Sequence, residues 1–141
     1  MKNKLLLSMA AATVVTLSGC TTIADMAGAD TATLNASASQ SYNAMVNDAR
    51  NKGQLDTSSA TYKRINNVFN RLKPVANQMN QTGTAFQWQL AVLKSDQVNA
   101  FVAPGGKVVF YTGIVNKLNL TDAEIAAIMG HEMVSVSYTH L

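Results

Sequence analysis

The chain has 141 residues, enough for one small domain, and a formal net charge of +3. Without Lys2 and Lys4, nine basic side chains stand against eight acidic ones, a balance of +1. This balance leaves no basic stripe for nucleic acid and excludes charge as the means of attaching the chain to an anionic membrane.

The first residues have the pattern of a secretory signal peptide. A basic head is followed by a mostly apolar run over residues 5–17, too short for a stable membrane span, and then by a small-residue cleavage site before Cys20. An N-terminal core helix is the alternative, but it does not account for the charged start and the Gly-Cys end. We therefore predict a signal peptide over residues 1–19.

Cys20 is the only cysteine, so it cannot form a disulfide within the chain. Together with the preceding Leu17-Ser18-Gly19 it resembles the lipobox of bacterial lipoproteins, in which the cysteine is acylated and becomes the mature N-terminus. Two acyl chains anchor a protein stably, because each buried CH₂ contributes roughly 0.8 kcal/mol. Thr21 follows instead of aspartate, which in such lipoproteins favours the outer membrane. The resemblance implies a protein held at the periplasmic face of the outer membrane through lipidated Cys20.

The mature chain is expected to begin with a tether. Residues 20–40 are rich in Ala, Thr, Ser and Asp and contain few large apolar side chains, so we predict no firm structure there. A short helix is expected over residues 41–52, ended by Gly53. The folded domain is therefore predicted to span residues 41–133.

The region from Tyr62 to Met79 has helical periodicity. Its apolar residues recur at three- and four-residue spacing, and basic and amide side chains occupy the other side. This stripe favours a helix packed on a core over a binding surface. Pro74 falls inside the pattern and predicts a kink or a break into two helices.

Beyond this helix the apolar period changes to two. Residues 86–93 predict one strand, and residues 98–103 and 108–111 predict two more. The Pro-Gly-Gly segment at 104–106 predicts a turn between the last two, since Pro fixes a negative φ and Gly accepts a positive one. We therefore expect an α+β fold with N-terminal helices, a small antiparallel sheet containing a hairpin, and a final helix.

The final helix is predicted to begin at Thr121. Thr121 and Glu124 have the spacing of a capping box, and Asp122 suits the positive end of a helix. His131 and Glu132 follow on this helix and form the first half of His-Glu-x-x-His. In that motif two histidines about 40° apart face one zinc ion, and the glutamate acts as general base. The dipeptide alone is weak evidence, because a histidine near a helix end is usually structural.

Three blocks in order make the chain resemble the HtpX- and Ste-type family of zinc metallopeptidases. That family carries an Asn-Ala-Phe-x-x-Pro-Gly-Gly strand and turn, a Tyr-Thr-Gly helix start and a Gly-His-Glu helix. The matching segments here are VNAFVAPGGK at 98–107, VFYTG at 109–113 and DAEIAAIMGHEM at 122–133. The resemblance extends over roughly residues 60–133, and with the lipobox it favours the periplasmic lipoprotein branch.

The resemblance implies a zincin-like domain, Zn²⁺ as cofactor, His131 as the first zinc ligand and Glu132 as the general base. It also implies that an extended peptide binds along an exposed sheet edge through main-chain hydrogen bonds. The implied enzyme is a membrane-anchored metalloendopeptidase that hydrolyses unfolded or misassembled envelope proteins. The residues that match the peptide-binding edge are Asn99, Ala100, Phe101, Val102 and Ala103.

The sequence departs from the family at the second zinc ligand, where Ser135 replaces histidine. His140 does not substitute for it, because nine residues beyond His131 is about 180° around a continuous helix. The family's third ligand, a glutamate on a later helix, is expected beyond Leu141. Since a catalytic zinc needs three protein ligands and a water, the chain as written is predicted to be an inactive, incomplete fragment.

Residues 134–141 alternate β-branched and hydroxyl side chains, which lowers helix propensity. We predict that they are a non-native tail. If Ser135 and this tail are genuine, the alternative is a non-catalytic outer-membrane lipoprotein that binds peptides or a partner through the edge at 99–103. A purely structural lipoprotein would leave the three blocks unexplained.

Overall fold

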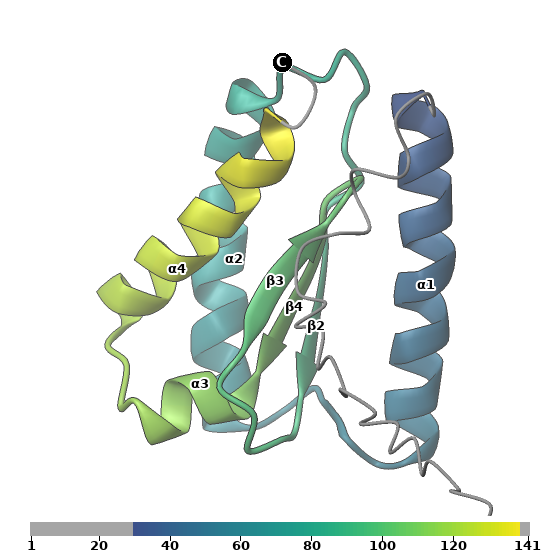
Figure 1. Cartoon of the computed structure of the whole chain (residues 1–141). Coiled ribbons are helices and arrows are strands. Elements are labelled where there is room, and N and C mark those ends of the chain that lie inside the picture. Colours follow the sequence, from purple (N-terminus) through teal and green to yellow (C-terminus); the bar gives the residue numbers. More distant parts are fainter. Residues whose placement is uncertain (1–29, 139–141) are drawn as a thin grey trace, which may run out of the picture.

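The computed structural model describes residues 30–138. The predicted signal peptide, Cys20 and His140 lie outside these residues. The described part contains four helices and a four-stranded sheet, which confirms the predicted α+β class (Figure 1). In chain order the elements are α1 (Thr31–Asn51), β1 (Leu55–Asp56), α2 (Ala60–Met79), β2 (Gln89–Leu93), β3 (Ala100–Ala103), β4 (Lys107–Tyr111), α3 (Thr112–Lys117) and α4 (Asp122–Ser137).

Helix α1 begins at Thr31, so the predicted lack of structure was wrong for residues 31–40. Residues 20–29 of the predicted tether lie outside the described residues. Asp30 caps this helix, and its carboxylate accepts a hydrogen bond from the backbone N of Thr33 at 2.8 Å. That bond lowers the pKa of Asp30. The alanines and serines of this segment were interpreted as a tether, but alanine is the best helix former and small side chains let the helix approach the sheet.

Helix α2 runs through Pro74 as one element, so of the two alternatives predicted there, a kink or a break into two helices, the break was wrong. Ser59 caps its start by accepting from the backbone N of Tyr62 at 3.0 Å. Buried residues lie on both sides of the proline, Phe69 before it and Ala76 after it, and both belong to the same core. Tertiary packing on both sides of the proline therefore keeps one helix at a position where the local signal allowed a break.

The sheet is mixed, with the strand order β1-β2-β4-β3. The hairpin of β3 and β4 is antiparallel as predicted, but β4 pairs with β2 in parallel, which contradicts the expected antiparallel sheet. Strand β1 was not predicted and pairs only with the end of β2. Residues 107–110 of β4 are all buried, whereas β3 is half-buried. Strand β4 is thus an interior strand, like β2, and β3 is left at an edge.

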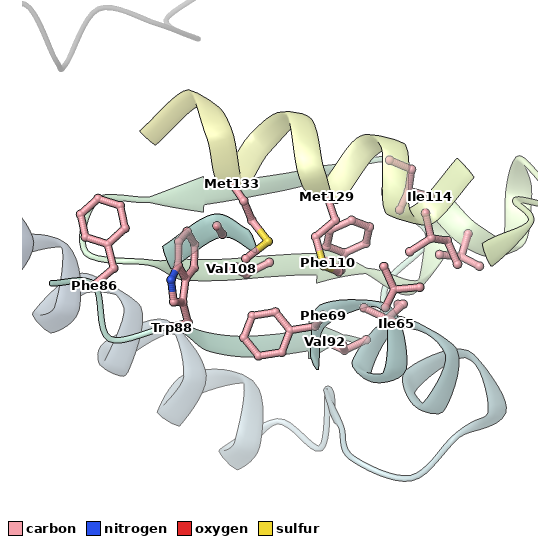
Figure 2. Close-up of a cluster of buried hydrophobic side chains, with 14 residues drawn as sticks. Ile65, Phe69, Phe86, Trp88, Val92, Val108, Phe110, Ile114, Met129 and Met133 are labelled. Carbon is pink, nitrogen blue, oxygen red and sulfur yellow. The ribbon is translucent and has the colours of Figure 1, made fainter. Parts of the chain in front are cut away.

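Helices α2 and α4 cover one face of the sheet, and α1 covers the other (Figure 1). Successive residues of β4 divide between the two layers, because strand side chains alternate: Val108 and Phe110 face α2 and α4, while Val109 faces α1. Met129 and Met133 of α4 reach the same core as Phe110 (Figure 2).

The turn between β3 and β4 confirms the Pro-Gly-Gly prediction. Gly105 and Gly106 have φ of +80° and +86°, a conformation that glycine adopts without a steric penalty. A side chain on Gly106 would also meet the ring of Trp88, with a Cβ only 2.9 Å from the indole. Trp88 itself is buried, as expected for a core residue, and its Nε1 donates to Asn77 Oδ1 at 2.7 Å.

Within residues 30–138, no helix is long and apolar enough to cross a membrane.

Candidate active site

Helix α4 is held at its N-terminus by a capping box, as predicted. Glu124 Oε2 accepts from the backbone N of Thr121 at 2.7 Å, and the Thr121 hydroxyl accepts from the backbone N of Glu124 at 3.3 Å. The hydrogen bonds from Thr121 lower the pKa of Glu124. Arg64 of α2 adds a second attachment, since its guanidinium donates to Asp122 Oδ1 at 2.7 Å and to the carbonyl of Leu120 at 2.6 Å. These contacts fix where the helix starts relative to α2.

The inner stripe of α4 determines its rotation about its own axis. Ile125, Met129 and Met133 are at most 1 % exposed and pack in the core at four-residue spacing. Figure 2 shows Met129 and Met133 pointing into this core. Ser137 continues this stripe, and its hydroxyl donates to the carbonyl of Met133 at 2.9 Å. The helix therefore extends four residues past Met133, beyond the point where the falling helix propensity had placed its end.

Glu132 lies on the flank of α4 that faces the edge strand. Gly130 and Val134, on the opposite flank, line a groove shared with α2. Helix α4 also packs on β3, which leaves the flank carrying Ile128 and Glu132 for that contact. Glu132 is half-buried there. Helical periodicity thus puts Glu132 on the side of α4 away from the groove shared with α2.

His131 and Ser135 lie on the solvent face of α4. Both are exposed, and four residues of helix separate their directions by about 40°. The Ser135 hydroxyl donates to the carbonyl of Glu132 at 2.8 Å. The structure thus gives these two positions the relation expected of the two histidines in His-Glu-x-x-His, with a hydroxyl in place of the second imidazole.

The donor set in this region does not fit zinc. Among residues 30–138, no group of three or more His, Cys, Asp or Glu side chains is arranged to hold a metal ion. His131 provides one imidazole, and the neutral hydroxyl of Ser135 is a weak donor beside the His, Cys and carboxylate ligands that zinc prefers. The described residues therefore supply one of the three protein ligands that a catalytic zinc requires.

Strand β3 lies at an edge of the sheet and exposes part of its backbone. The carbonyl of Asn99 accepts from the backbone N of Tyr111 at 3.2 Å, so the backbone groups of Asn99 and Phe101 point toward β4. By strand alternation those of Ala100 and Val102 point away from the sheet. Asn99 precedes the strand, and Ala100–Ala103 form it. The sequence prediction grouped all five residues as one edge, but Ala100 and Val102 carry its outward hydrogen-bonding groups.

The loop before β3 is held by Thr112 and Gly113 at the start of α3. Thr112 Oγ1 accepts from the backbone N of Ser95 and donates to its carbonyl, each at 3.1 Å, and the backbone N of Gly113 donates to the same carbonyl at 2.8 Å. Gly113 is required sterically, because an added Cβ would lie 2.4 Å from the carbonyl oxygen of Gln97. The Tyr-Thr-Gly block was recognised in the sequence, but its role in positioning the edge strand became visible only in the structure.

Comparison with known proteins identifies one metallopeptidase family and two metalloprotease relatives. Residues 59–141 match the family model of peptidase family M48. Metalloprotease LoiP of Escherichia coli (strain K12) is 31% identical over 144 residues, which cover 97% of this chain and 54% of LoiP. Mitochondrial metalloendopeptidase OMA1 of Arabidopsis thaliana is 44% identical over 46 residues, 33% of this chain and 9% of OMA1. No solved structure gives a significant match. The chain spans about half of LoiP and less than a tenth of OMA1.

Proposed function

The chain belongs to peptidase family M48, and from this premise we propose that it is part of a zinc metalloendopeptidase that cleaves unfolded or misassembled envelope proteins. In this proposal His131 is the first zinc ligand and Glu132 the general base of the complete enzyme. We further propose that the chain as written is inactive, which is supported by the lack of a three-ligand group among residues 30–138. The observation that carries the proposal is the position of half-buried Glu132 on the flank of α4 that faces the β3 edge.

The β3 edge supports a preference for unfolded substrates. The outward backbone groups of Ala100 and Val102 offer hydrogen bonds to any extended polypeptide, because main-chain pairing does not depend on side-chain identity. A folded protein has its backbone groups already paired, so only an unfolded segment can add a strand there. In this proposal, a peptide on this edge presents a carbonyl to Glu132, the proposed base.

The activity is tested on the product of the complete gene from which this sequence derives. We expect zinc-dependent hydrolysis of casein, lost in His131→Ala and in Glu132→Gln, a change that preserves the shape of a half-buried side chain. The 141-residue chain should show none. The proposal is contradicted if the complete product does not hydrolyse casein, or if neither substitution lowers the rate of hydrolysis. Hydrolysis by the 141-residue chain contradicts its proposed inactivity.

A second candidate function is a non-catalytic lipoprotein that binds peptides through the same edge. Ser135 favours it, because a hydroxyl at the second ligand position is incompatible with an ordinary zinc peptidase site. Sequencing the source gene through codon 135 and beyond codon 141 separates the two proposals. A histidine codon and a longer reading frame favour the enzyme, whereas serine and a stop codon favour the binding protein, which should bind peptides in the presence of EDTA.

We also propose that the protein is anchored to the periplasmic face of the outer membrane by acyl chains on Cys20. The lipobox-like Leu-Ser-Gly-Cys segment supports this, and Thr21 supports the outer over the inner membrane. The test is radiolabelled palmitate incorporation and membrane fractionation in a Gram-negative host. Wild type should be labelled and should fractionate with outer membranes, and Cys20→Ala should not be labelled. A labelled Cys20→Ala protein would contradict the anchor.

A further inference from the structure

We propose that the groove between α1 and β3 is a specificity subsite that receives an aliphatic side chain of the peptide bound at the β3 edge. The inference rests on the proposed peptide binding, but not on hydrolysis. It assigns a role to α1, which lies on the face of the sheet opposite α4 (Figure 1).

Strand geometry determines which side chains of a bound peptide reach this groove. Side chains of neighbouring residues in paired strands point to the same face of a sheet. Ala100 and Val102 belong to the layer of α2 and α4, whereas Phe101 belongs to the layer of α1. A peptide residue beside Phe101 therefore points toward α1, and its two neighbours point toward α4 and Glu132. The peptide presents alternate side chains to the two layers.

The Phe101 position also brings the peptide side chain close. Because the outward backbone groups are those of Ala100 and Val102, an antiparallel peptide makes its hydrogen-bonded pairs with these two residues. The residue between them sits opposite Phe101 in a non-hydrogen-bonded pair, the arrangement in which side chains approach most closely. One peptide side chain is thereby directed into the space between Phe101 and α1.

That space is a groove of about 120 Å³ with almost entirely apolar walls. Its volume accommodates the branched end of leucine or valine. Tyr42 is uncharged at neutral pH, and burial raises its pKa further, to about 12. A charged peptide side chain would lose water without gaining a partner. The residues that line the groove are Ala38, Ser41, Tyr42, Met45, Phe101 and Ala103.

The groove therefore selects the peptide residue beside Phe101 by size and polarity. Leucine has three more carbon atoms than alanine, and their burial in a half-open groove should strengthen binding about tenfold. Aspartate at the same position should bind more weakly than alanine. The flanking residues, which face α4, should not influence this preference.

The experiment measures binding, so it does not depend on activity. Fluorescein-labelled heptapeptides carry leucine, alanine or aspartate at the centre, flanked by threonines, and are titrated with the 141-residue chain in EDTA while anisotropy is recorded.

Ser41→Leu extends an apolar side chain into the groove from an exposed position of α1. Ala44→Leu is the matched control, because Ala44 is exposed on the same helix and does not line the groove. A leucine peptide methylated at its backbone nitrogens tests strand pairing without altering the protein.

Wild type and Ala44→Leu should bind the leucine peptide about tenfold more tightly than the alanine peptide. Ser41→Leu should bind both equally, at the affinity of the alanine peptide, while keeping the wild-type circular dichroism spectrum. The subsite proposal is wrong if wild type binds the two peptides equally, or if Ser41→Leu keeps the preference for leucine. The edge-strand proposal still stands in that case, provided that methylation abolishes binding. Undiminished binding of the methylated peptide overturns the edge-strand proposal, and the subsite with it.

Discussion

Thr112 holds Ser95 through a reciprocal pair of hydrogen bonds, with its Oγ1 accepting from the backbone N and donating to the backbone O, both at 3.1 Å. Seventeen residues separate the two in sequence, and the contact joins the start of α3 to the loop that leads into β3. The edge strand therefore has one end held by the turn at Gly105 and Gly106 and the other by this contact. This support matters for the proposed peptide binding, because β3 has a paired strand on one side only.

Thr112→Val should loosen the loop before β3 while preserving side-chain volume. It removes both hydrogen bonds to part-buried backbone groups of Ser95. We expect a loss of about 1–3 kcal/mol in the free energy of unfolding, measured by urea denaturation, together with faster hydrogen exchange at the Ser95 amide. Thr112→Ser keeps the hydroxyl and is the control. If valine and serine behave alike, the hydrogen bonds do not support the loop.

Gly113→Ala should destabilise the fold, and Gly130→Ala should not. A Cβ at Gly113 would lie 2.4 Å from the carbonyl oxygen of Gln97 and 2.5 Å from the carbonyl carbon of Asp96, so backbone must move. We expect a cost of about 3 kcal/mol. Gly130 lies inside α4 with nothing within 4 Å of an added Cβ, so alanine there should stabilise by about 0.5–1 kcal/mol. Urea denaturation of both variants checks the prediction, and equal effects would contradict it.

Asp56 should make stability depend on pH in the acid range. Desolvation by burial acts to raise its pKa, but hydrogen bonds from Ser59 and Ser58, with the nearby charge of Lys94, outweigh it and hold the pKa below its ordinary value of 3.8. A carboxyl with a depressed folded-state pKa stabilises the fold above its unfolded-state pKa. This stabilisation is lost as pH falls through the folded-state value. The free energy of unfolding should therefore decline as pH drops below about 4.

The Asp56→Asn variant isolates this contribution, because it keeps an acceptor oxygen for Ser59 but cannot titrate. Its free energy of unfolding, measured between neutral pH and about pH 3, should decline less steeply than that of wild type. Some decline should remain, since hydrogen bonding also lowers the pKa of Asp30 and Glu124. Identical slopes for variant and wild type would show that Asp56 does not contribute.

Ser135→His should convert the exposed face of α4 into a zinc-binding pair. His131 and a histidine at 135 would point about 40° apart on the helix surface, as in His-Glu-x-x-His. We expect zinc affinity at least about tenfold above wild type, measured by competition with a chromophoric chelator. The gain should vanish in the double variant with His131→Ala. Zinc binding equal to wild type would show that the two positions do not share a ligand-binding face.

The candidate site could be predicted from the sequence where its signals are local. The capping box at Thr121 and Glu124 fixed the start of α4, and the Pro-Gly-Gly turn fixed the hairpin. The start of α1 was missed because its alanines and serines carry no strong periodic apolar pattern. Ala38, which lines the proposed subsite, was therefore assigned to a tether, whereas Ser41 was placed at the start of the expected short helix. A signal for them existed in the helix propensity of alanine and in the capping aspartate Asp30.

The sequence by itself determined the type and approximate position of the helices and strands that carry His131, Glu132 and the 99–103 segment. Those properties depend on residues within a few positions of one another, whose spacing and capping chemistry are readable along the chain. Only the tertiary structure decided that α2 stays continuous at Pro74, that β4 lies inside the sheet, and that Glu132 faces β3. These outcomes depend on burial between segments far apart in sequence. Local propensities, worth at most a few kcal/mol, do not specify which segments meet.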